Sequence, residues 1–323
     1  MVLSVRSLLT AALDRVGRNE RAAATLSAAL EQAGAQTLAD RIDSRRSGGG
    51  IEPIVLPAGP NAFRRRRIKM FGLNGNDQIG RAVRDGGWRA FECPLPDVYC
   101  LFARRATGQV YDVGANTGFY SLVAVTANHG LTVHAFEPAR DVFPLLERNV
   151  GLCPRRKHIT MTATAVSDKV GAAEFFVPLS SGVVETSSSL EGGFKESHQE
   201  TYRVPVTTLD DYWRSGGRQP VAMIKIDVEG HELSALLGTK ELVDACRPVL
   251  VVEVLARAPL QELDDFRRAH DLVDVRISPA EFVIGEPVRW DPAAWNHLFL
   301  PRERLENDLG TLAALGVRMT RVG

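Results

Sequence analysis

From residue 110 onward, short apolar runs alternate with stretches of helical periodicity. The apolar runs have the composition of buried strands, and they cover residues 110–113, 132–136, 159–166, 222–226 and 249–254. The helical periodicity covers residues 119–127, 142–150 and 232–246. Strands that are apolar along their whole length are typical of a parallel sheet with helices on both faces. The pattern predicts an α/β fold with a doubly wound, mostly parallel sheet, and residues 271–277 and 297–300 are candidates for further strands.

The pattern before and within this region is different. Residues 1–48 carry apolar side chains at helical spacing, which predicts an N-terminal helical extension that packs on the core or on a twin subunit. A helix pair that docks a partner or lies on a membrane surface is the alternative. A lead-in segment, residues 49–104, precedes the predicted core domain at residues 105–323. Residues 172–212 are less regular, and we expect this insert to act as a lid, because its glycines permit movement.

Composition limits the class of protein. Of the 323 residues, 45% are hydrophobic and 24% are charged, as in an ordinary soluble globular protein and unlike a disordered chain or a coiled-coil rod. Lys plus Arg and Asp plus Glu each number 39, which argues against nucleic acid as a partner. The longest uncharged stretch, residues 113–136, has an apolar centre too short for a transmembrane segment. Four cysteines without C-x-x-C spacing fit a reducing, cytoplasmic compartment.

The first candidate for chemistry is the turn that follows the predicted strand at residues 110–113. Gly114, Asn116 and Gly118 permit a tight turn into the next helix and let the backbone approach a ligand closely. Ligands of open α/β sheets bind beyond the carboxyl ends of the strands. Glu137 follows the next strand, where its carboxylate is placed to accept hydrogen bonds from two ribose hydroxyls, the alternative being a helix cap. These positions indicate a nucleoside site.

The spacing of this turn distinguishes between two nucleoside cofactors. Pyrophosphate binding uses the pattern G-x-G-x-x-G, whereas here three residues separate the glycines and Asp112 precedes them. Because Asp112 would repel a phosphate but can hold a cationic or amino-acid group, the turn favours S-adenosylmethionine over NAD. Ser167 and Asp168, at the end of the third predicted strand, are then placed to reach the adenine amino group. A turn or a helix cap is the alternative role for this pair.

The second candidate is the segment MIKIDVEGHE. Asp227 and Glu229 follow its strand. They are expected at the same edge of the sheet as the two earlier acids, Asp112 and Glu137. Four acids that converge on one edge repel one another unless a ligand or a cation lies among them. This convergence indicates a functional site at that edge.

The ordered motifs VYDVGANTGFYSL, AFEP, AVSD, TTLDD, MIKIDVEGHE and VVEV resemble the FkbM family of S-adenosylmethionine-dependent methyltransferases, over about residues 105–256. The resemblance implies a Rossmann-like methyltransferase core and O-methylation of a sugar, glycoside or polyketide-type small molecule. The residues to which it assigns cofactor contacts are Asp112, Gly114, Asn116 and Gly118 in the loop, Glu137 at the ribose, Ser167 and Asp168 by the adenine, and Asp227 near the methionine end. The chain departs from the family pattern at Leu152-Cys153 and at His231.

A hydroxyl acceptor reacts faster when a general base removes its proton. His231 is the first candidate for this base, because histidine titrates near neutral pH, and Asp227 and Glu229 are alternatives. Asp227 and Glu253, at the ends of neighbouring strands, are instead candidate ligands for Mg²⁺, which prefers oxygen ligands and lowers the pKa of a bound hydroxyl. A solvent-facing helix start is the structural alternative for His231, and a buried structural acid is the alternative for Glu253.

The sequence leaves two other classes of function open. One is a non-catalytic nucleoside-binding module whose N-terminal helices dock a partner. The other is an NAD-dependent oxidoreductase, which the spacing of the glycines disfavours. For the methyltransferase, we expect a small-molecule or glycan acceptor and no nucleic-acid partner. The helical extension makes a homodimer reasonable.

Overall fold

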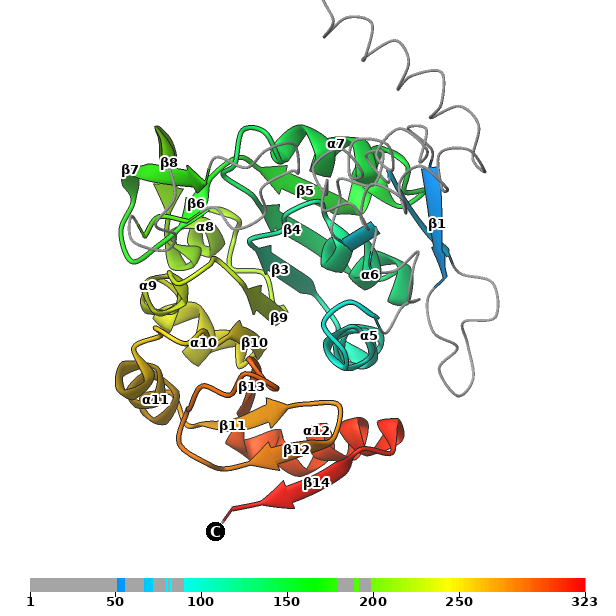
Figure 1. Ribbon diagram of the computed structural model, residues 1–323, viewed down its shortest axis with the longest axis vertical. Coiled ribbons are helices and arrows are strands. Elements are labelled where there is room, and N and C mark those ends of the chain that lie inside the picture. Colours follow the sequence, from blue (N-terminus) through cyan, green and yellow to red (C-terminus); the bar gives the residue numbers. More distant parts are fainter. Residues whose placement is uncertain are drawn as a thin grey trace, which may run out of the picture.

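The computed structural model describes residues 51–55, 67–71, 79–80, 82, 90–178, 189–191 and 199–322. The predicted N-terminal helices lie outside these residues, as do residue 323 and the glycines on which the lid expectation rests, Gly182, Gly192 and Gly193. The described strands form three sheets, of which the largest has nine strands (Figure 1).

Five parallel strands make up one half of the large sheet. In spatial order they are β10 (Val249–Glu253), β9 (Val221–Ile226), β3 (Gln109–Val113), β4 (Thr132–Phe136) and β5 (Ile159–Thr162). Each strand pairs in parallel with its neighbour. Most of their side chains are buried, as the continuous apolar runs require of strands covered on both faces. The predicted parallel sheet is confirmed.

The other half of the large sheet is mixed. Its strands continue from β10 in the order β13 (Asn296–Pro301), β11 (Leu272–Ile277), β12 (Glu281–Ile284) and β14 (Arg318–Arg321). The first three pairings are antiparallel and the last is parallel. The strands expected at residues 271–277 and 297–300 are thus confirmed as β11 and β13. Strands β12 and β14 had no predicted counterpart.

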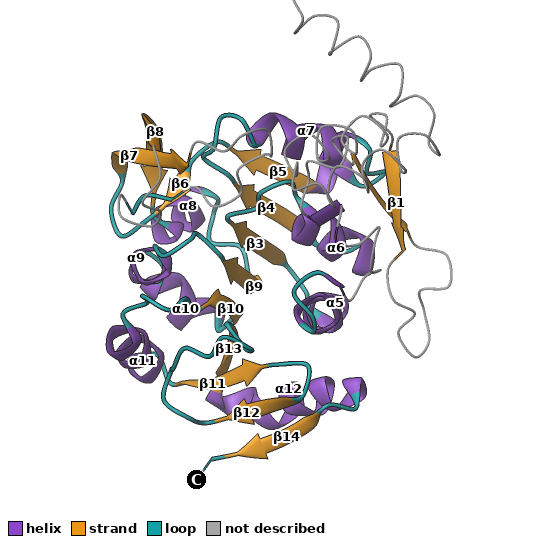
Figure 2. Cartoon of the chain, in the orientation of Figure 1, coloured by secondary structure: helices purple, strands orange, loops and turns teal. Residues whose placement is uncertain are grey.

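Helices cover both faces of the sheet, as the doubly wound prediction required (Figure 2). One face carries α5 (Leu95–Arg105), α6 (Phe119–Ala127), α7 (Phe143–Gly151) and α12 (Leu305–Leu312). The other carries α8 (Leu209–Ser215), α9 (Glu232–Leu237), α10 (Lys240–Cys246) and α11 (Leu260–Ala269). Successive residues of β9 point to opposite faces, so Met223 packs in the first core and Ile224 in the second.

The strand predicted at residues 159–166 is wrong as a single element. The main-sheet strand ends at Thr162, whose carbonyl accepts the N–H of Thr164 in a turn. The chain then enters a different sheet as β6 (Ala165–Val166). Both pieces have β-forming residues, so the local pattern did not reveal the turn between them.

The small sheet holds much of the predicted insert. Its order is β6-β8-β7, in which β7 (Gly171–Pro178) and β8 (Gln199–Thr207) form an antiparallel pair. It encloses an apolar core of its own, to which Phe175 and Val204 contribute. This core fixes the small sheet beside the ends of β4 and β5, to the left of the upper part of the large sheet in Figure 1.

The helix predicted at residues 232–246 is also wrong as a single element, because it divides into α9 and α10 at Gly238 and Thr239. A Cβ atom on Gly238 would lie 2.1 Å from the carbonyl oxygen of Ser167, so the close approach of that strand end requires glycine here. The carboxylate of Asp210 then accepts the N–H of Glu241 and of Leu242, which satisfies the first turn of α10.

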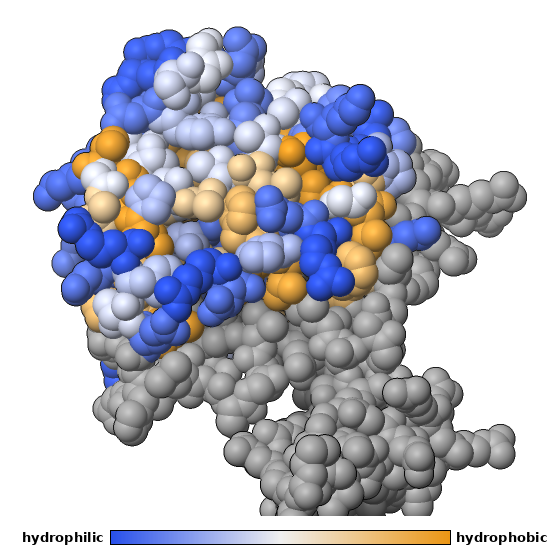
Figure 3. Space-filling model, turned by 90° about the horizontal axis from the view of Figure 1, so that it is seen from above, coloured by the Kyte–Doolittle hydropathy of each residue, from blue (hydrophilic) through white to orange (hydrophobic). Residues whose placement is uncertain are grey.

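No helix in the described part of the chain is long and apolar enough to cross a membrane. All four cysteines are free thiols. On the face seen from above, the described hydrophobic residues form separate patches among hydrophilic ones (Figure 3). This mixture agrees with the balanced composition of the chain.

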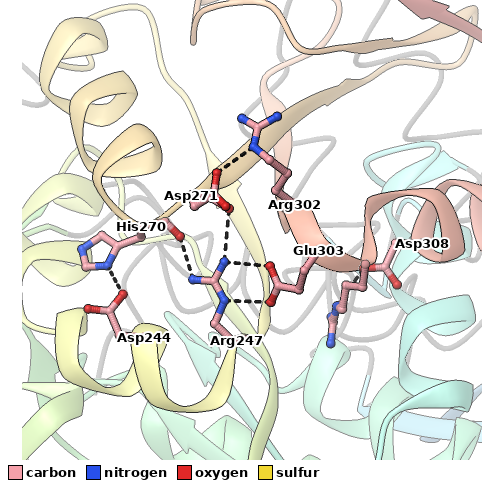
Figure 4. Close-up of polar contacts among 8 residues, drawn as sticks. Asp244, Arg247, His270, Asp271, Arg302, Glu303 and Asp308 are labelled. Atoms are coloured by element: carbon pink, nitrogen blue, oxygen red, sulfur yellow. Dashed lines mark hydrogen bonds and ion pairs between the residues drawn. The ribbon is translucent and has the colours of Figure 1, made fainter.

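A cluster around Arg247 joins the two halves of the sheet at the amino-terminal edge of the parallel strands (Figure 4). Its guanidinium donates to both carboxylate oxygens of Glu303, at 2.9 and 3.0 Å. It also donates to the carbonyl oxygens of His270 and Asp271, at 2.6 and 3.1 Å. Because these residues adjoin β10, β11 and β13, the cluster fixes the ends of three neighbouring strands.

We expect Glu303→Gln to lower the free energy of unfolding by about 1 kcal/mol at pH 6, because it removes a two-bond pair with Arg247. Hydrogen bonds from Arg247 lower the pKa of Glu303 from 4.5 to about 2. The pair therefore contributes fully above pH 4.5, and its contribution is lost as the pH falls towards 2. Urea denaturation of both proteins between pH 6 and pH 3 measures the difference, which should shrink at the acidic end. Glu306→Gln, in an exposed pair with Arg321, is the matched control, and a pH-independent difference would contradict the assignment.

Candidate active site

A cavity of about 190 Å³ lies at the carboxyl ends of the central strands. Its wall includes Val113 at the end of β3, Phe136 at the end of β4 and Glu253 at the end of β10. The small sheet closes another side, with Val166 and Phe175. The cavity is therefore where ligands of open α/β sheets bind.

The glycine turn forms the floor next to β3. A Cβ atom on Gly114 would lie 1.7 Å from the carbonyl oxygen of Asp227, and the residue has a φ of 76°. Gly118, with a φ of 92°, precedes the first turn of α6 and packs against Leu146. Gly114 and Asn116 line the cavity, whereas Gly118 lies outside its described wall. The turn thus brings the ends of β3 and β9 into contact.

Glu137 lies in the cavity wall with its carboxylate held by the backbone. The N–H of Asn116 donates to Oε2 and the N–H of Ala139 donates to Oε1, both at 2.8 Å. Burial raises the pKa of Glu137 to about 7, against the opposing effect of these two hydrogen bonds. Each carboxylate oxygen can accept a further hydrogen bond. The arrangement suits a ligand that offers two neighbouring hydroxyls.

The wall also contains a buried ammonium group. Nζ of Lys225 lies 2.6 Å from Oδ2 of Asp227 and 4.7 Å from the ring centroid of Tyr120. Burial lowers the pKa of Lys225, but the charges of Asp227 and Glu92 outweigh it, so the pKa lies above its usual value. The positive charge of Lys225 therefore compensates part of the repulsion among the acids that were predicted to converge here. The alternation of Ile and charged residues in this strand did not indicate that Lys225 would be the counter-ion of the acids.

Glu92 also lines the cavity, although no pattern in the sequence marks it as a site residue. Its Oε2 accepts the hydroxyl of Tyr120 at 2.6 Å. Burial raises the pKa of Glu92 to about 7; the charge of Asp227 raises it further, while Lys225 and the Tyr120 hydrogen bond oppose the increase. No local motif surrounds Glu92, which comes from the lead-in segment and meets a residue 28 positions later.

Asp112 lies beneath the cavity and outside its described wall. It is fully buried, and its Oδ2 accepts the hydroxyl of Ser121 at 2.6 Å. Burial raises its pKa, against the effect of Lys225. Of the four acids predicted to converge, Glu137, Asp227 and Glu229 line the cavity. A direct contact between Asp112 and a cofactor stays a prediction.

The turn after β9 is held by an acid that the sequence analysis passed over. Oε1 of Glu232 accepts the N–H of Val228 at 3.2 Å and that of Gly230 at 3.0 Å. Burial raises the pKa of Glu232 to about 7. These bonds fix the turn in which Glu229 has a φ of 55°. The sequence signal for this role is a Glu-Gly pair followed two residues later by a second Glu, here Glu229, Gly230 and Glu232.

His231 and Ser167, to which the sequence analysis gave separate roles, contact each other. Nε2 of His231 lies 2.9 Å from Oγ of Ser167, and Nδ1 lies 2.8 Å from Oε1 of Glu191. The Ser167 hydroxyl also donates to Asp168 at 3.1 Å. His231 lines the cavity, but Ser167 and Asp168 lie outside its described wall. Since both ring nitrogens of His231 have partners, it can take a proton from an acceptor only after one of these contacts breaks.

The structure does not support the magnesium hypothesis. The described residues contain no group of three or more His, Cys, Asp or Glu side chains arranged to hold a metal ion. Asp227 pairs with Lys225, while Oε2 of Glu253 is buried and has no hydrogen-bond partner among the described residues. Burial, followed by the charges of Asp227 and Glu229, raises the pKa of Glu253 well above its usual value. A protonated Glu253 is a hydrogen-bond donor and a poor metal ligand.

Comparison with known families decides the class to which this site belongs. Residues 112–275, just over half of the chain, match the model of the methyltransferase FkbM domain. The chain belongs to this methyltransferase family. Its matched region contains the glycine turn, Glu137 and the turn after β9. The resemblance found in the sequence motifs is thus confirmed.

Two relatives show how far the similarity extends. The chain is 31% identical over 156 residues to the 31-O-demethyl-FK506 methyltransferase FkbM of Streptomyces tacrolimicus, covering 41% of this chain and 59% of that protein. It is 28% identical over 145 residues to the hexuronic acid methyltransferase AglP of Haloferax volcanii, covering 44% and 54%. The matches thus span less than two thirds of either relative. The crystal structure of methyltransferase FkbM from Methylobacillus flagellatus KT aligns with a TM-score of 0.42 and 18% identity, over 60% of this chain and 43% of that one.

We expect Gly114→Ala to lower the free energy of unfolding by roughly 3 kcal/mol or more, because the new methyl group collides with the carbonyl of Asp227 at a backbone conformation that alanine disfavours. Urea denaturation measures the loss. Gly310→Ala is the matched control, since a Cβ atom there meets nothing within 4 Å and helix α12 favours alanine. Equal stability of the two variants would show that β3 and β9 do not approach as described.

Proposed function

We propose that this protein transfers a methyl group from S-adenosylmethionine to a hydroxyl group of a small-molecule or glycan acceptor. The observation that carries the proposal is the buried carboxylate of Glu137, which faces the cavity while backbone N–H groups of the glycine turn and of Ala139 fix it. Membership of the methyltransferase family supports the same conclusion.

The cavity wall fits the chemistry of this cofactor in three respects. The carboxylate of Glu137 suits a ribose diol. Apolar side chains such as Phe175 and Leu190 suit a purine ring, and the acids beside Lys225 suit a cationic group. When bound, the cofactor supplies a methyl group activated by a positively charged sulfur. The protein then has to align an acceptor and to exclude water.

The roles of the other predicted contacts follow from their positions. Asn116 lines the cavity and fixes Glu137 through its backbone N–H, and Gly114 permits the approach of β9. Ser167 contacts His231 and donates to Asp168, so we assign this pair to the support of the cavity wall at the cofactor end. The segment at residues 189–191 reaches this region from the insert, which supports the lid role proposed for residues 172–212.

The names of the relatives suggest two kinds of acceptor. One relative methylates 31-O-demethyl-FK506 and the other a hexuronic acid. We therefore propose a sugar, a glycoside or a polyketide-type molecule with a hydroxyl group. A cytoplasmic location and a homodimer formed through residues 1–48 stay predictions. The two other classes of function, a non-catalytic binding module and an NAD-dependent oxidoreductase, are tested by the same experiments.

We expect S-adenosylhomocysteine to bind about tenfold more weakly at pH 6 than at pH 8. Glu137, with a pKa near 7, is mostly protonated at pH 6 and must lose its proton before both oxygens can accept ribose hydroxyls. Calorimetric titration of the wild type at both pH values measures this difference. Glu137→Gln should bind weakly and without this pH dependence. Tight binding by Glu137→Ala, or binding of NAD instead, would contradict the proposal.

The second expectation concerns turnover. Purified protein supplied with S-adenosylmethionine should methylate at least one member of a panel that contains 31-O-demethyl-FK506 and glycosides of neutral and uronic sugars, as mass spectrometry detects. Since the described residues provide no metal-ligand set, EDTA should leave the rate unchanged. Cofactor binding without any methylated product would favour the non-catalytic module. If EDTA abolished activity and Mg²⁺ restored it, the result would support Asp227 and Glu253 as metal ligands.

A further inference from the structure

Transfer to a hydroxyl requires a group in the cavity wall that can take a proton. His231 has partners at both ring nitrogens, and Asp227 is paired at 2.6 Å with Lys225. The carboxylate of Glu137 is held by two backbone N–H groups at the proposed ribose position. His231 and Glu137 thus each have two partners and Asp227 has a charged one, whereas the Glu92 carboxylate accepts a single hydrogen bond from a neutral group among the described residues.

Glu92 occupies a distinct position in that wall. It precedes α5, in a part of the chain that belongs to neither the glycine turn nor the turn after β9. Its backbone has a φ of 44°, a conformation rare for a residue with a side chain, and its carbonyl accepts the N–H of Leu95. This backbone conformation accompanies a carboxylate that points to the cavity, where the Tyr120 hydroxyl holds it at 2.6 Å.

We propose that Glu92 is the general base that accepts the proton of the acceptor hydroxyl, and that Tyr120 is the positioning residue that orients its carboxylate. The inference rests on the proposed function. In the step, the acceptor oxygen forms the new bond to the methyl carbon and the electron pair of the carbon–sulfur bond stays on sulfur. The O–H bond breaks, and its proton ends on an Oε atom of Glu92. Atoms and charges balance, since a carboxylate and a sulfonium become a carboxylic acid and a thioether.

The charges around Glu92 suit this role. Burial raises its pKa to about 7, close to the value at which a base is most effective at neutral pH. The charge of Asp227 also raises the pKa of Glu92, whereas Lys225 and the Tyr120 hydroxyl lower it. The charge of Glu92 in turn raises the pKa of Glu253. Lys225 thereby keeps the carboxylate form accessible in a wall that is otherwise acidic.

The test compares Glu92→Gln with wild type, using an acceptor identified in the panel and a saturating concentration of S-adenosylmethionine. Under saturation, the titration of Glu137, which acts on cofactor affinity, does not contribute to kcat. We expect kcat to fall by 10²- to 10⁴-fold with little change in KM, and the acidic limb of the kcat profile near pH 7 to disappear. Calorimetric titration of S-adenosylhomocysteine should give the wild-type affinity and the wild-type pH dependence in Glu92→Gln.

Tyr120→Phe tests the positioning role, because phenylalanine keeps the ring against Lys225 and removes only the hydroxyl. Without this hydrogen bond the pKa of Glu92 should rise, so the acidic limb of kcat should move to higher pH, with a smaller loss at pH 9 than at pH 7. If the acidic limb of the kcat profile did not shift in Tyr120→Phe, Tyr120 would have a structural role only, and its assignment as a positioning residue would be overturned.

Three results would overturn the assignment of Glu92. They are wild-type kcat in Glu92→Gln, loss of S-adenosylhomocysteine binding in that variant, and disappearance of the acidic limb in Glu229→Gln or His231→Gln instead. The binding result needs no acceptor, so it decides against the base even if the panel yields no product. Failure of the proposed function is distinguishable, because it appears as absent cofactor binding or absent turnover in the wild type itself.

Discussion

The site is organised around the ion pair between Lys225 and Asp227. The ammonium group of Lys225 is buried among carboxylates at the ends of the central strands. An unpaired charge at that depth would be strongly unfavourable, and the 2.6 Å contact with Asp227 compensates for it. One cation cannot balance every nearby acid. Burial raises the pKa of Glu92, Asp112 and Glu253, and the charge of Asp227 raises each of them further. With a pKa of about 7, the carboxyl groups of Glu92 and Glu137 in the wall can hold or release protons near neutral pH, as acid–base chemistry requires.

The backbone supplies the other half of the organisation. Gly114 lets β3 and β9 approach until only a hydrogen atom fits between its Cα and the carbonyl of Asp227. Glu137 and Glu232 are then held by N–H groups of the two turns, so their positions depend on main-chain geometry. Glu92 is held by the Tyr120 side chain instead. The end that we assign to the cofactor is thus fixed by the backbone, whereas the end assigned to the acceptor depends on side chains.

The sequence predicted the parts of the fold whose periodicity is local. The limits of α6 and β4 agree with the apolar pattern, because each element is bounded by a glycine turn or a polar residue. The break at Gly238 was not predictable, since its cause is a carbonyl 71 residues earlier in the chain, at Ser167. Glu137 and Asp227 were predicted as site residues because they follow apolar strands. Glu92 follows none, and only the folded chain brings it to Tyr120.

Glu92 and Glu137 show why equal pKa values do not imply equal roles. Burial raises both to about 7, yet the two carboxylates differ in what opposes that effect. Two backbone N–H groups hold Glu137 in one orientation, so its titration changes how well it accepts hydrogen bonds from a ligand. Glu92 has a hydrogen bond from the Tyr120 hydroxyl and lies near the ammonium group of Lys225. Its protonation therefore depends on the charge and polarity of a ligand bound beside it. The first arrangement suits recognition, and the second suits the transfer of a proton during the reaction.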